Sequence, residues 1–376
     1  MPCLEPEFGD AGWANFSYYD DYQSDGRPHP ETILVPLSWS LIVAVGVITN
    51  ALVVFVVVLQ MKMSTVTNYY IVNLALTDLT FLLFCIPFTT MTFIPHSFLN
   101  DGICTVVMYV QQASVHATCM TLTVMSADRY FAIVFPIKSL KYRTRRLAFL
   151  LNLGVWILSY IMAVPSAVFV EVFHQDDYWT CCETFHTHRD RGVYYTYVFL
   201  TTYIIPLAII SVCYSLLLFE MWTKHNLTAS TTLRARKNLQ QKRRTTRMLL
   251  MVVFLFFVFW LPTHIFNCWD RYTNGGPDFS KHEALYNFRI FSYTLAYSNS
   301  CVNPFVYAFM GNNFRTSFKK AFPCCFRRQI GARGSTRRMQ RRGTVDGATR
   351  VTVLAPREDI EMNMNNNMAP MVQAAL

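Results

Sequence analysis

Charged residues are scarce in this chain of 376 residues. Asp, Glu, Lys and Arg together make up 15% of it, whereas 53% of the residues are hydrophobic. Soluble domains carry about 25% charged residues. The low charge therefore excludes an ordinary soluble protein and favours lipid as the surrounding medium.

Seven stretches lack charge almost completely. They cover residues 33–61, 69–94, 103–127, 148–170, 193–219, 248–268 and 290–311. Each is close to or above the roughly 20 residues that a helix needs to cross a bilayer. Because backbone groups in lipid find no water, each stretch must be helical. The sequence predicts an all-α membrane protein, a seven-transmembrane helix bundle over residues 33–311.

The loops and tails at the two ends of the bundle differ in charge: acidic residues are scarce at one end and basic residues at the other. Residues 224–247, the loop after the fifth stretch, contain no acid, and residues 1–32 contain Arg27 as their only Lys or Arg. Short basic loops lie on the cytoplasmic side. We expect a multi-pass plasma-membrane protein with an extracellular N-terminal tail (1–32) and a cytoplasmic C-terminus. The net charge of +10 reflects this bias, so no nucleic-acid partner is expected, and Asn15 is a glycosylation candidate on the outer side.

The segment after the seventh stretch, residues 312–325, has the pattern of an amphipathic eighth helix. Its apolar residues recur at i, i+4 and i+7, which is typical of a helix lying in the membrane interface. They are Phe314, Phe318 and Ala321. Cys324 and Cys325 follow beside the membrane and are palmitoylation candidates, with two plain reduced cysteines as the alternative. Residues 326–376 lack helical periodicity, and we expect a disordered cytoplasmic tail.

The only acid within the seven stretches is Asp78. An acid inside a membrane is costly and marks a functional site. Its candidate partners are the polar residues of other stretches, Asn50, Thr118, Asn299, Ser300 and Asn303. One carboxylate with several neutral oxygens suits a sodium ion, and a protonated, hydrogen-bonded aspartic acid is the alternative. No other metal or cofactor is expected.

Several motifs follow one another in order along the stretches. They are Asn50, Asp78, Cys104, Asp128-Arg129-Tyr130, Trp156, Pro206, Tyr214, Phe256, Trp260-Leu261-Pro262 and Asn303-Pro304-Phe305-Val306-Tyr307. With these motifs, residues 33–322 resemble the rhodopsin-like (class A) G-protein-coupled receptors. The resemblance implies a receptor and not an enzyme, with a heterotrimeric G protein and arrestin as inner partners.

The resemblance implies an activation switch in the inner half of the bundle. The pair of Asp128 and Arg129 would hold the inner face closed, and its release would free Arg129 for the G protein. Pro262 and Pro304 each remove a backbone hydrogen bond and kink their helices, so that the inner part of the sixth helix can swing. The implied switch residues are Asp128, Arg129, Tyr130, Pro206, Tyr214, Phe256, Trp260, Pro262, Pro304 and Tyr307.

The resemblance also implies a disulfide that ties the second outer loop to the start of the third helix. It joins Cys104 to Cys181, with Cys182 as the alternative partner. Whichever cysteine is left over is an extra thiol, for which Cys3 is a candidate mate.

Single residues argue against two ligand classes. Amine receptors of this family carry Asp where this chain has Gln111, and opsins carry Lys where it has Tyr297. The acidic outer side favours a cationic peptide, because such a field raises its on-rate; a solvated acidic face without a ligand role is the alternative. The expected pocket residues are neutral or aromatic and suit an amidated peptide end: Gln111, Gln112, His264, Asn267, Tyr286 and Tyr293.

Longer stretches narrow the resemblance to the kisspeptin receptors of this family: residues 65–71, 78–83, 86–89 and 109–118, with 296–300 shared by the galanin receptors. This implies a neuropeptide ending in Arg-Phe-amide, a Gq-type G protein, phospholipase C and calcium release. A galanin or allatostatin-A type receptor that couples to Gi is the alternative. A transporter or channel would need a continuous polar path, and the seven stretches offer only Asp78 and two histidines.

Overall fold

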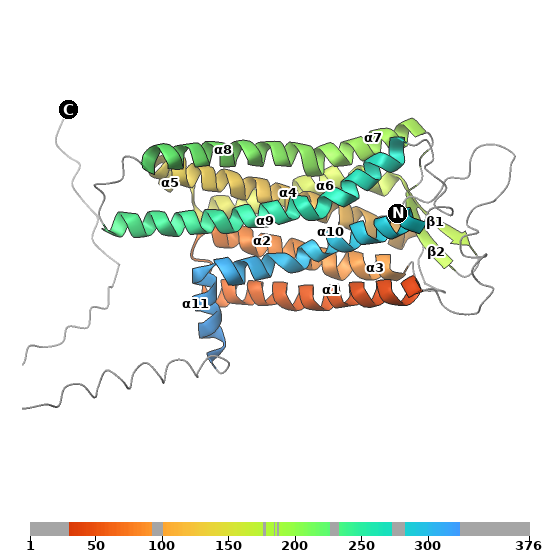
Figure 1. The fold of residues 1–376 in the computed structure, drawn as a ribbon, viewed down its shortest axis with the longest axis horizontal. Helices are drawn as coiled ribbons and strands as arrows, with labels where there is room; N and C mark the ends of the chain where they lie inside the picture. Colours follow the sequence, from red (N-terminus) through yellow and green to blue (C-terminus); the bar gives the residue numbers. More distant parts are fainter. Residues whose placement is uncertain are drawn as a thin grey trace, which may run out of the picture. The chain divides into compact units, whose positions relative to one another are not determined.

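The structure is a computed structural model that describes residues 30–91, 101–175, 178–183, 185, 188–225, 233–272 and 283–323. Within this part of the chain, seven long helical segments run along one another (Figure 1). Three of them contain one wider, π-helical turn, labelled η. This arrangement confirms the predicted seven-helix bundle.

The segments begin and end as follows. They are α1 (Pro30–Phe55) with η2 (Val56–Gln60); α2 (Val66–Thr80) with η3 (Phe81–Cys85) and α3 (Ile86–Met91); α4 (Asp101–Val134); α6 (Arg145–Val168); α7 (His188–Phe199) with η4 (Leu200–Ile204) and α8 (Ile205–His225); α9 (Leu233–Tyr272); and α10 (Glu283–Met310).

Five of the seven segments are long and apolar enough, by composition, to cross a membrane: residues 33–60, 66–91, 145–168, 189–222 and 243–269. The other two, α4 and α10, are long, with 34 and 28 residues, but more polar. Their polar side chains are buried inside the bundle, among them Ser114, His116, Asn299, Ser300 and Asn303. These two helices were predicted as spans because their stretches carry no charge.

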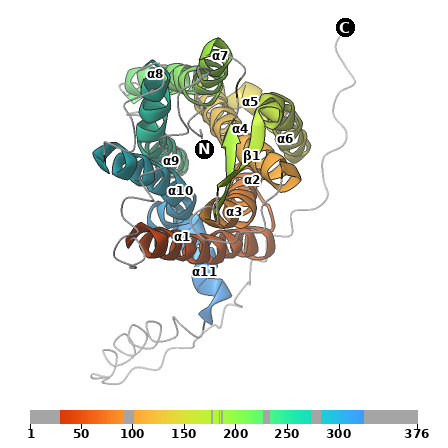
Figure 2. The same cartoon turned by 90° about the vertical axis from the view of Figure 1, so that its right-hand side faces the viewer.

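The third segment, α4, is the central helix of the bundle. It packs against α2, α6, α8 and α9, and in the end-on view the other helices are arranged around it and one another in a ring (Figure 2). Its side chains Leu122 and Met125 are almost fully buried. Elsewhere in the bundle, Gly46 lets α1 approach the second and seventh segments closely, because a Cβ at this position would lie 2.7 Å from Leu82 and 3.0 Å from Cys301.

The π-helical turn in the fifth segment has a local cause at Pro206. Proline has no N–H, so the carbonyl four residues earlier loses its helical donor. That carbonyl belongs to Thr202, and it accepts a hydrogen bond from the thiol of Cys119 on α4 at 3.0 Å. The π-helical turn η4 covers this site, so the irregular backbone is stabilised by the neighbouring helix.

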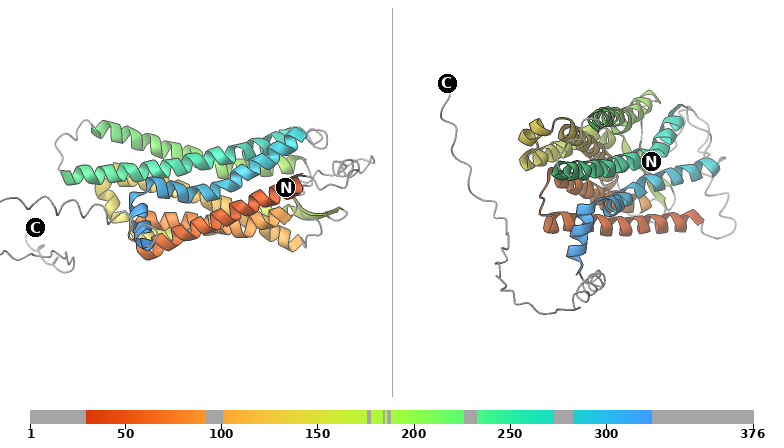
Figure 3. Two further views of the ribbon diagram at one scale, coloured as in Figure 1. Left: turned by 60° about the horizontal axis from the view of Figure 1, so that its bottom comes forward. Right: turned by 60° about the vertical axis from the view of Figure 1, so that its left-hand side comes forward.

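Four further elements lie at the two ends of the bundle. At one end, β1 (Val170–Gln175) and β2 (Tyr178–Glu183) form an antiparallel hairpin that pairs Val172 with Cys181, where the sequence had indicated only a loop. At the other end, α5 (Pro136–Tyr142) follows α4, and α11 (Asn312–Ala321) leaves the bundle at an angle (Figure 3).

The predicted eighth helix is confirmed as α11. The rings of Phe314 and Phe318 lie 6.3 Å apart, and those of Phe318 and Phe322 lie 4.9 Å apart. Phe322 also contacts Phe55 at the inner end of the first segment, with 6.1 Å between ring centroids. Phe322, the residue after the end of α11, therefore continues the aromatic contacts of its apolar face.

Candidate functional site

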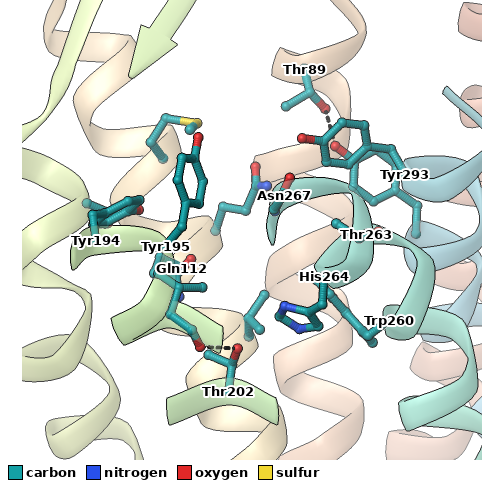
Figure 4. Close-up of a pocket in the computed structure, with 16 residues that line it drawn as sticks. Thr89, Gln112, Tyr194, Tyr195, Thr202, Trp260, Thr263, His264, Asn267 and Tyr293 are labelled. Atoms are coloured by element: carbon teal, nitrogen blue, oxygen red, sulfur yellow. Dashed lines mark hydrogen bonds between the residues drawn. The ribbon is translucent and has the colours of Figure 1, made fainter. Parts of the chain in front are cut away.

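A pocket opens between the helices in the half of the bundle that carries the hairpin (Figure 4). Its empty space is about 840 Å³, a figure that includes open solvent. Five of the six predicted pocket residues line it, and the side chain of the sixth, Tyr286, lies outside the described ones. The further lining residues are Thr89, Met108, Val115, Ser166, Tyr194, Tyr195, Val198, Thr202, Trp260, Thr263 and Tyr297.

The described lining of the pocket holds no carboxylate, Lys or Arg. Its one imidazole, His264, is 5% exposed. Three rings surround it, Phe199 at 5.5 Å, Tyr203 at 4.9 Å and Trp260 at 6.2 Å between centroids. The site is therefore an uncharged, aromatic cavity with a few polar groups.

Two polar atoms of the lining have no hydrogen-bond partner among the described residues. They are the side-chain oxygen Oε1 of Gln111 and the indole Nε1 of Trp260. One is an acceptor and the other a donor. Buried polar groups are nearly always paired, so these two atoms suit a ligand that both donates and accepts.

One wall of the pocket is an aromatic cluster that the sequence analysis missed. Phe185, from the loop after the hairpin, packs its ring 5.0 Å from Phe169 at the end of α6 and 6.0 Å from Tyr195 on α7. Tyr194 completes the cluster, 5.5 Å from Phe185. The cluster joins three separate chain segments, and no local pattern marks it.

A second aromatic chain lies beneath the pocket and connects the first helix to the sixth. Trp39 donates from its indole to Thr294 at 2.9 Å and packs edge-on against Tyr297 at 4.9 Å. Tyr297 contacts Phe81 at 5.5 Å, and Phe81 contacts Trp260 at 6.4 Å. Trp260 therefore lies at the floor of the pocket, in contact with the predicted switch residue Phe256 below it at 5.9 Å.

The predicted polar core is partly assembled around Asp78, which is 2% exposed. Asn303 donates to its carboxylate at 2.9 Å, and Ser300 is a second partner. Asn50 reaches the same place through the backbone carbonyl of Ser300 at 2.8 Å. Thr118 instead donates to the carbonyl of Ser114 on its own helix.

The donor set of this core fits a sodium ion. The carboxylate of Asp78 and the hydroxyl of its partner Ser300 are hard oxygen ligands, as alkali and alkaline-earth cations prefer. The side-chain oxygens of Asn299 and Ser114 are also buried without a hydrogen-bond partner in the described part of the chain, and the sodium site itself stays a prediction. No group of three His, Cys, Asp or Glu side chains that could hold another metal occurs among the described residues.

At the inner end, Asp128 and Arg129 form the predicted pair, with 2.5 Å between Nη2 and Oδ2. Arg129 also donates to the hydroxyl of Thr67 on α2. A third charged residue, Arg143, binds both carboxylate oxygens of Asp128 at 2.7 and 3.0 Å. Arg143 carries no distinguishing signal in the sequence, because a basic residue in an inner loop is ordinary.

The remaining switch residues occupy the expected helices. Pro206 follows η4, Pro262 lies within α9 and Pro304 within α10. The other three are Tyr130, whose ring packs against Phe131 and Phe135, and the buried Tyr214 and Tyr307. Their roles in switching stay predictions.

Several predicted modification sites lie outside the described residues or their side chains: Asn15, Cys181, Cys182, Cys324 and Cys325. Cys104 is fully buried and disulfide-bonded. The hairpin register places the backbones of residues 181 and 182 opposite 172 and 171. Which of the two cysteines pairs with Cys104 stays a prediction.

Comparison with known proteins gives one consistent result. Residues 49–307 match the family described as "7 transmembrane receptor (rhodopsin family)". G-protein coupled receptor 54 of Oreochromis niloticus is 33% identical over 332 residues, covering 84% of this chain and 87% of the relative. The KiSS-1 receptor of Mus musculus is 35% identical over 317 residues (82% and 80%). The galanin receptor type 1 of Rattus norvegicus is 36% identical over 316 residues (81% and 88%).

Proposed function

Because the chain belongs to the rhodopsin family of seven-transmembrane receptors, as a peptide receptor coupled to G proteins, we propose that its ligand is a kisspeptin-like neuropeptide that ends in Arg-Phe-amide. On binding, the receptor activates a Gq-type G protein and, through phospholipase C, calcium release. The residues that resemble kisspeptin receptors and the relatives named above support this choice. The ligand chemistry is supported by the pocket itself.

The observation that carries the proposal is the pair of unpartnered atoms in the pocket. A primary amide has a carbonyl oxygen that can accept from Nε1 of Trp260 and an NH₂ group that can donate to Oε1 of Gln111. A free carboxylate has only acceptors at neutral pH, so it leaves Oε1 of Gln111 without a donor. A buried polar group without its partner costs about 1–3 kcal/mol.

The charge of the peptide terminus also favours the amide over the free acid, and by a larger free energy than the hydrogen bonds do. The described lining offers no cation to pair with a carboxylate, and burying an unpaired charge costs several kcal/mol. An amide removes that charge. The phenyl ring of the terminal residue fits among the aromatic side chains Tyr293, Tyr297 and Trp260.

The arginine of such a peptide belongs at the mouth of the pocket. No described lining residue is acidic, so a guanidinium would be unpaired if it went deep. Residues 171–183 include Glu171, Asp176, Asp177 and Glu183, and such acidic residues raise the local concentration of a cationic peptide. An uncharged terminus would thus enter first, with the cation behind it.

The test compares one peptide in two chemical forms. Cells that express the receptor are treated with the kisspeptin decapeptide as the amide and as the free acid, and calcium and cyclic AMP are recorded in parallel. We expect the amide to be at least roughly 100-fold more potent. In Gln111→Leu, this preference should shrink by roughly ten-fold, because the acceptor is gone. Ile265→Ala, on the lipid-facing side of α9 with 53% exposure, is the control.

Two outcomes would contradict the proposal. Equal potency of amide and acid would remove the role of the uncharged pocket. A response to galanin or allatostatin-A, with no response to the kisspeptin peptide, would favour the alternative ligands, and a fall in cyclic AMP without calcium release would favour Gi.

Other features of the receptor are proposed on the same basis. A sodium ion at Asp78 would be held by the oxygens described above and stabilise the resting arrangement. A disulfide from Cys104 to Cys181 would tether the hairpin. Asn15 would carry a glycan outside, Cys324 and Cys325 would carry palmitate inside, and arrestin would bind the C-terminal tail after phosphorylation.

A further inference from the structure

The carboxylate of Asp128 is shared between two arginines from different parts of the fold. Arg129, its neighbour on α4, contacts Oδ2 alone, whereas Arg143 contacts Oδ1 through Nε and Oδ2 through Nη2. The side chains of Asp128 and Arg129 are 6% and 8% exposed, and that of Arg143 is 27% exposed. Asp128 is thus a buried carboxylate with two cationic partners, and Arg143 holds it with two hydrogen bonds.

Arg143 is held in place by the junction of two helices. It follows the last residue of α5, and its N–H donates to the carbonyl of Ser139 at 2.8 Å. The next residue, Thr144, caps the start of α6, and its hydroxyl accepts from the N–H of Leu147 at 3.1 Å. With α5 ending on one side and α6 starting on the other, the guanidinium of Arg143 is directed at Asp128.

The inner part of the sixth segment, α9, contains no acidic residue that could pair with Arg129. The only acid of α9 is Asp270, at its outer end, and the inner end of α9 instead donates from Arg244 to the carbonyl of Met310 at 2.8 Å. Among the described residues, Arg129 donates hydrogen bonds to Asp128 and Thr67. When Arg129 turns toward a G protein, the group it leaves behind is the buried carboxylate of Asp128.

A buried carboxylate that loses its only cation is strongly destabilised. With Arg143 present, Asp128 keeps a bidentate partner after Arg129 has left. We propose that Arg143 is a positioning residue that stabilises the signalling state, because it keeps Asp128 paired while Arg129 is released. It would therefore not act as a second lock on the resting state.

The experiment measures how tightly the ligand-free receptor binds G protein. Full-length receptor in lipid nanodiscs is titrated with nucleotide-free heterotrimers of the Gq, Gi and Gs classes. Arg143→Gln should weaken binding roughly ten-fold, since the lost pair is buried at Asp128 but partly exposed at Arg143. Arg143→Lys should restore part of the affinity. Arg146→Gln removes the same charge three residues away, at an exposed side chain, and should leave binding unchanged.

A double substitution separates this role from a direct contact with the G protein. In an Asp128→Asn background no carboxylate remains to be stabilised, so Arg143→Gln should change the affinity by less than roughly two-fold. A full ten-fold loss in that background would mean that Arg143 binds the G protein itself. Tighter binding by Arg143→Gln with Asp128 intact would make Arg143 a lock. Either result would overturn the inference.

Two points of the design keep the binding result interpretable. Should Arg143→Gln fail to fold, as judged by surface expression and thermal melting, the Arg143→Lys variant carries the test, because it keeps the charge but loses the bidentate geometry. The inference rests on membership of the receptor family and not on the proposed Gq coupling. Binding of Gi or Gs instead of Gq would correct that coupling and leave the Arg143 comparison intact.

Discussion

Replacing Asn73 by Leu tests how the three helices at the centre of the bundle are held together. The amide of Asn73, on α2, donates to the hydroxyl of Thr121 on α4 at 2.8 Å and accepts from the indole Nε1 of Trp156 on α6 at 2.9 Å. Asn73 is 4% exposed. Leucine has nearly the same size but makes neither hydrogen bond, so the substitution removes a polar junction without opening a large cavity.

The two lost hydrogen bonds contribute unequally to the loss of stability. Thr121 keeps its hydrogen bond to the carbonyl of Ala117, so it loses only a second interaction. Trp156 loses the partner of its only N–H, and lipid cannot replace that partner as water would. Inter-helix hydrogen bonds in membranes average about 0.6 kcal/mol, whereas an orphaned buried donor costs about 1–3 kcal/mol. We expect a total loss of about 2 kcal/mol, dominated by Trp156.

Thermal melting of the purified receptor in detergent measures this loss. For domains of about 150–250 residues, 1 kcal/mol shifts the midpoint by about 2–4 °C, so Asn73→Leu should lower the apparent midpoint by roughly 4–8 °C. The matched control is Asn152→Leu, also an Asn that links α6 to α2, but through a single hydrogen bond to the carbonyl of Tyr69 at 3.0 Å. Its effect should be about half as large or less.

A double-mutant cycle identifies the source of the loss. Once Asn73 is Leu, Trp156 has no partner left to lose, so Trp156→Phe should cost less in that background than in the unsubstituted receptor. Additive effects of the two substitutions would refute the reasoning that the indole N–H carries most of the loss.

Three further predictions concern packing, the polar core and the outer end. Gly46→Ala should lower the melting midpoint, because its Cβ meets Leu82 at 2.7 Å and overpacking costs about 1–3 kcal/mol; Gly154→Ala, with open space around it, should be neutral or stabilising, and equal effects would rule out the close packing. Asp78→Asn should abolish the effect of sodium on agonist affinity, by removing the only acid of the seven stretches, and an unchanged sodium dependence in radioligand binding would argue against the ion site. Cys104→Ala should abolish peptide binding through loss of the loop tether; normal affinity at normal surface expression would show that no tether is needed.

The number and approximate limits of the helices followed from local composition. A stretch of about 20 residues without charge must be helical in lipid whatever surrounds it, so even the more polar α4 and α10 were predicted. The order of motifs along these stretches also indicated the receptor family, and the family match over residues 49–307 agrees with it. Most of the expected pocket residues could be named in advance, because in this family a position along a helix implies its depth and face.

The hairpin and the aromatic wall could not be predicted in the same way. β1 and β2 are six residues each, a length at which alternation of apolar and polar residues is a weak signal. Phe169, Phe185 and Tyr195 come from three segments, and their contact depends on how the loop folds back over the helices. Arg143 likewise resembles any basic residue of an inner loop until α5 brings it to Asp128.

The sequence by itself determined the solvent of this protein, its seven spans and the family to which it belongs, because each of these depends on the types of residues in short stretches of chain. Only the tertiary structure decided which polar atoms are paired and which are left open. The contacts of Asn73 with Trp156 and of Arg143 with Asp128 depend on the rotation and spacing of helices that are distant in the sequence. The same holds for the unpartnered atoms of Gln111 and Trp260 in the pocket. No periodicity along one helix predicts how two helices are rotated and spaced relative to each other.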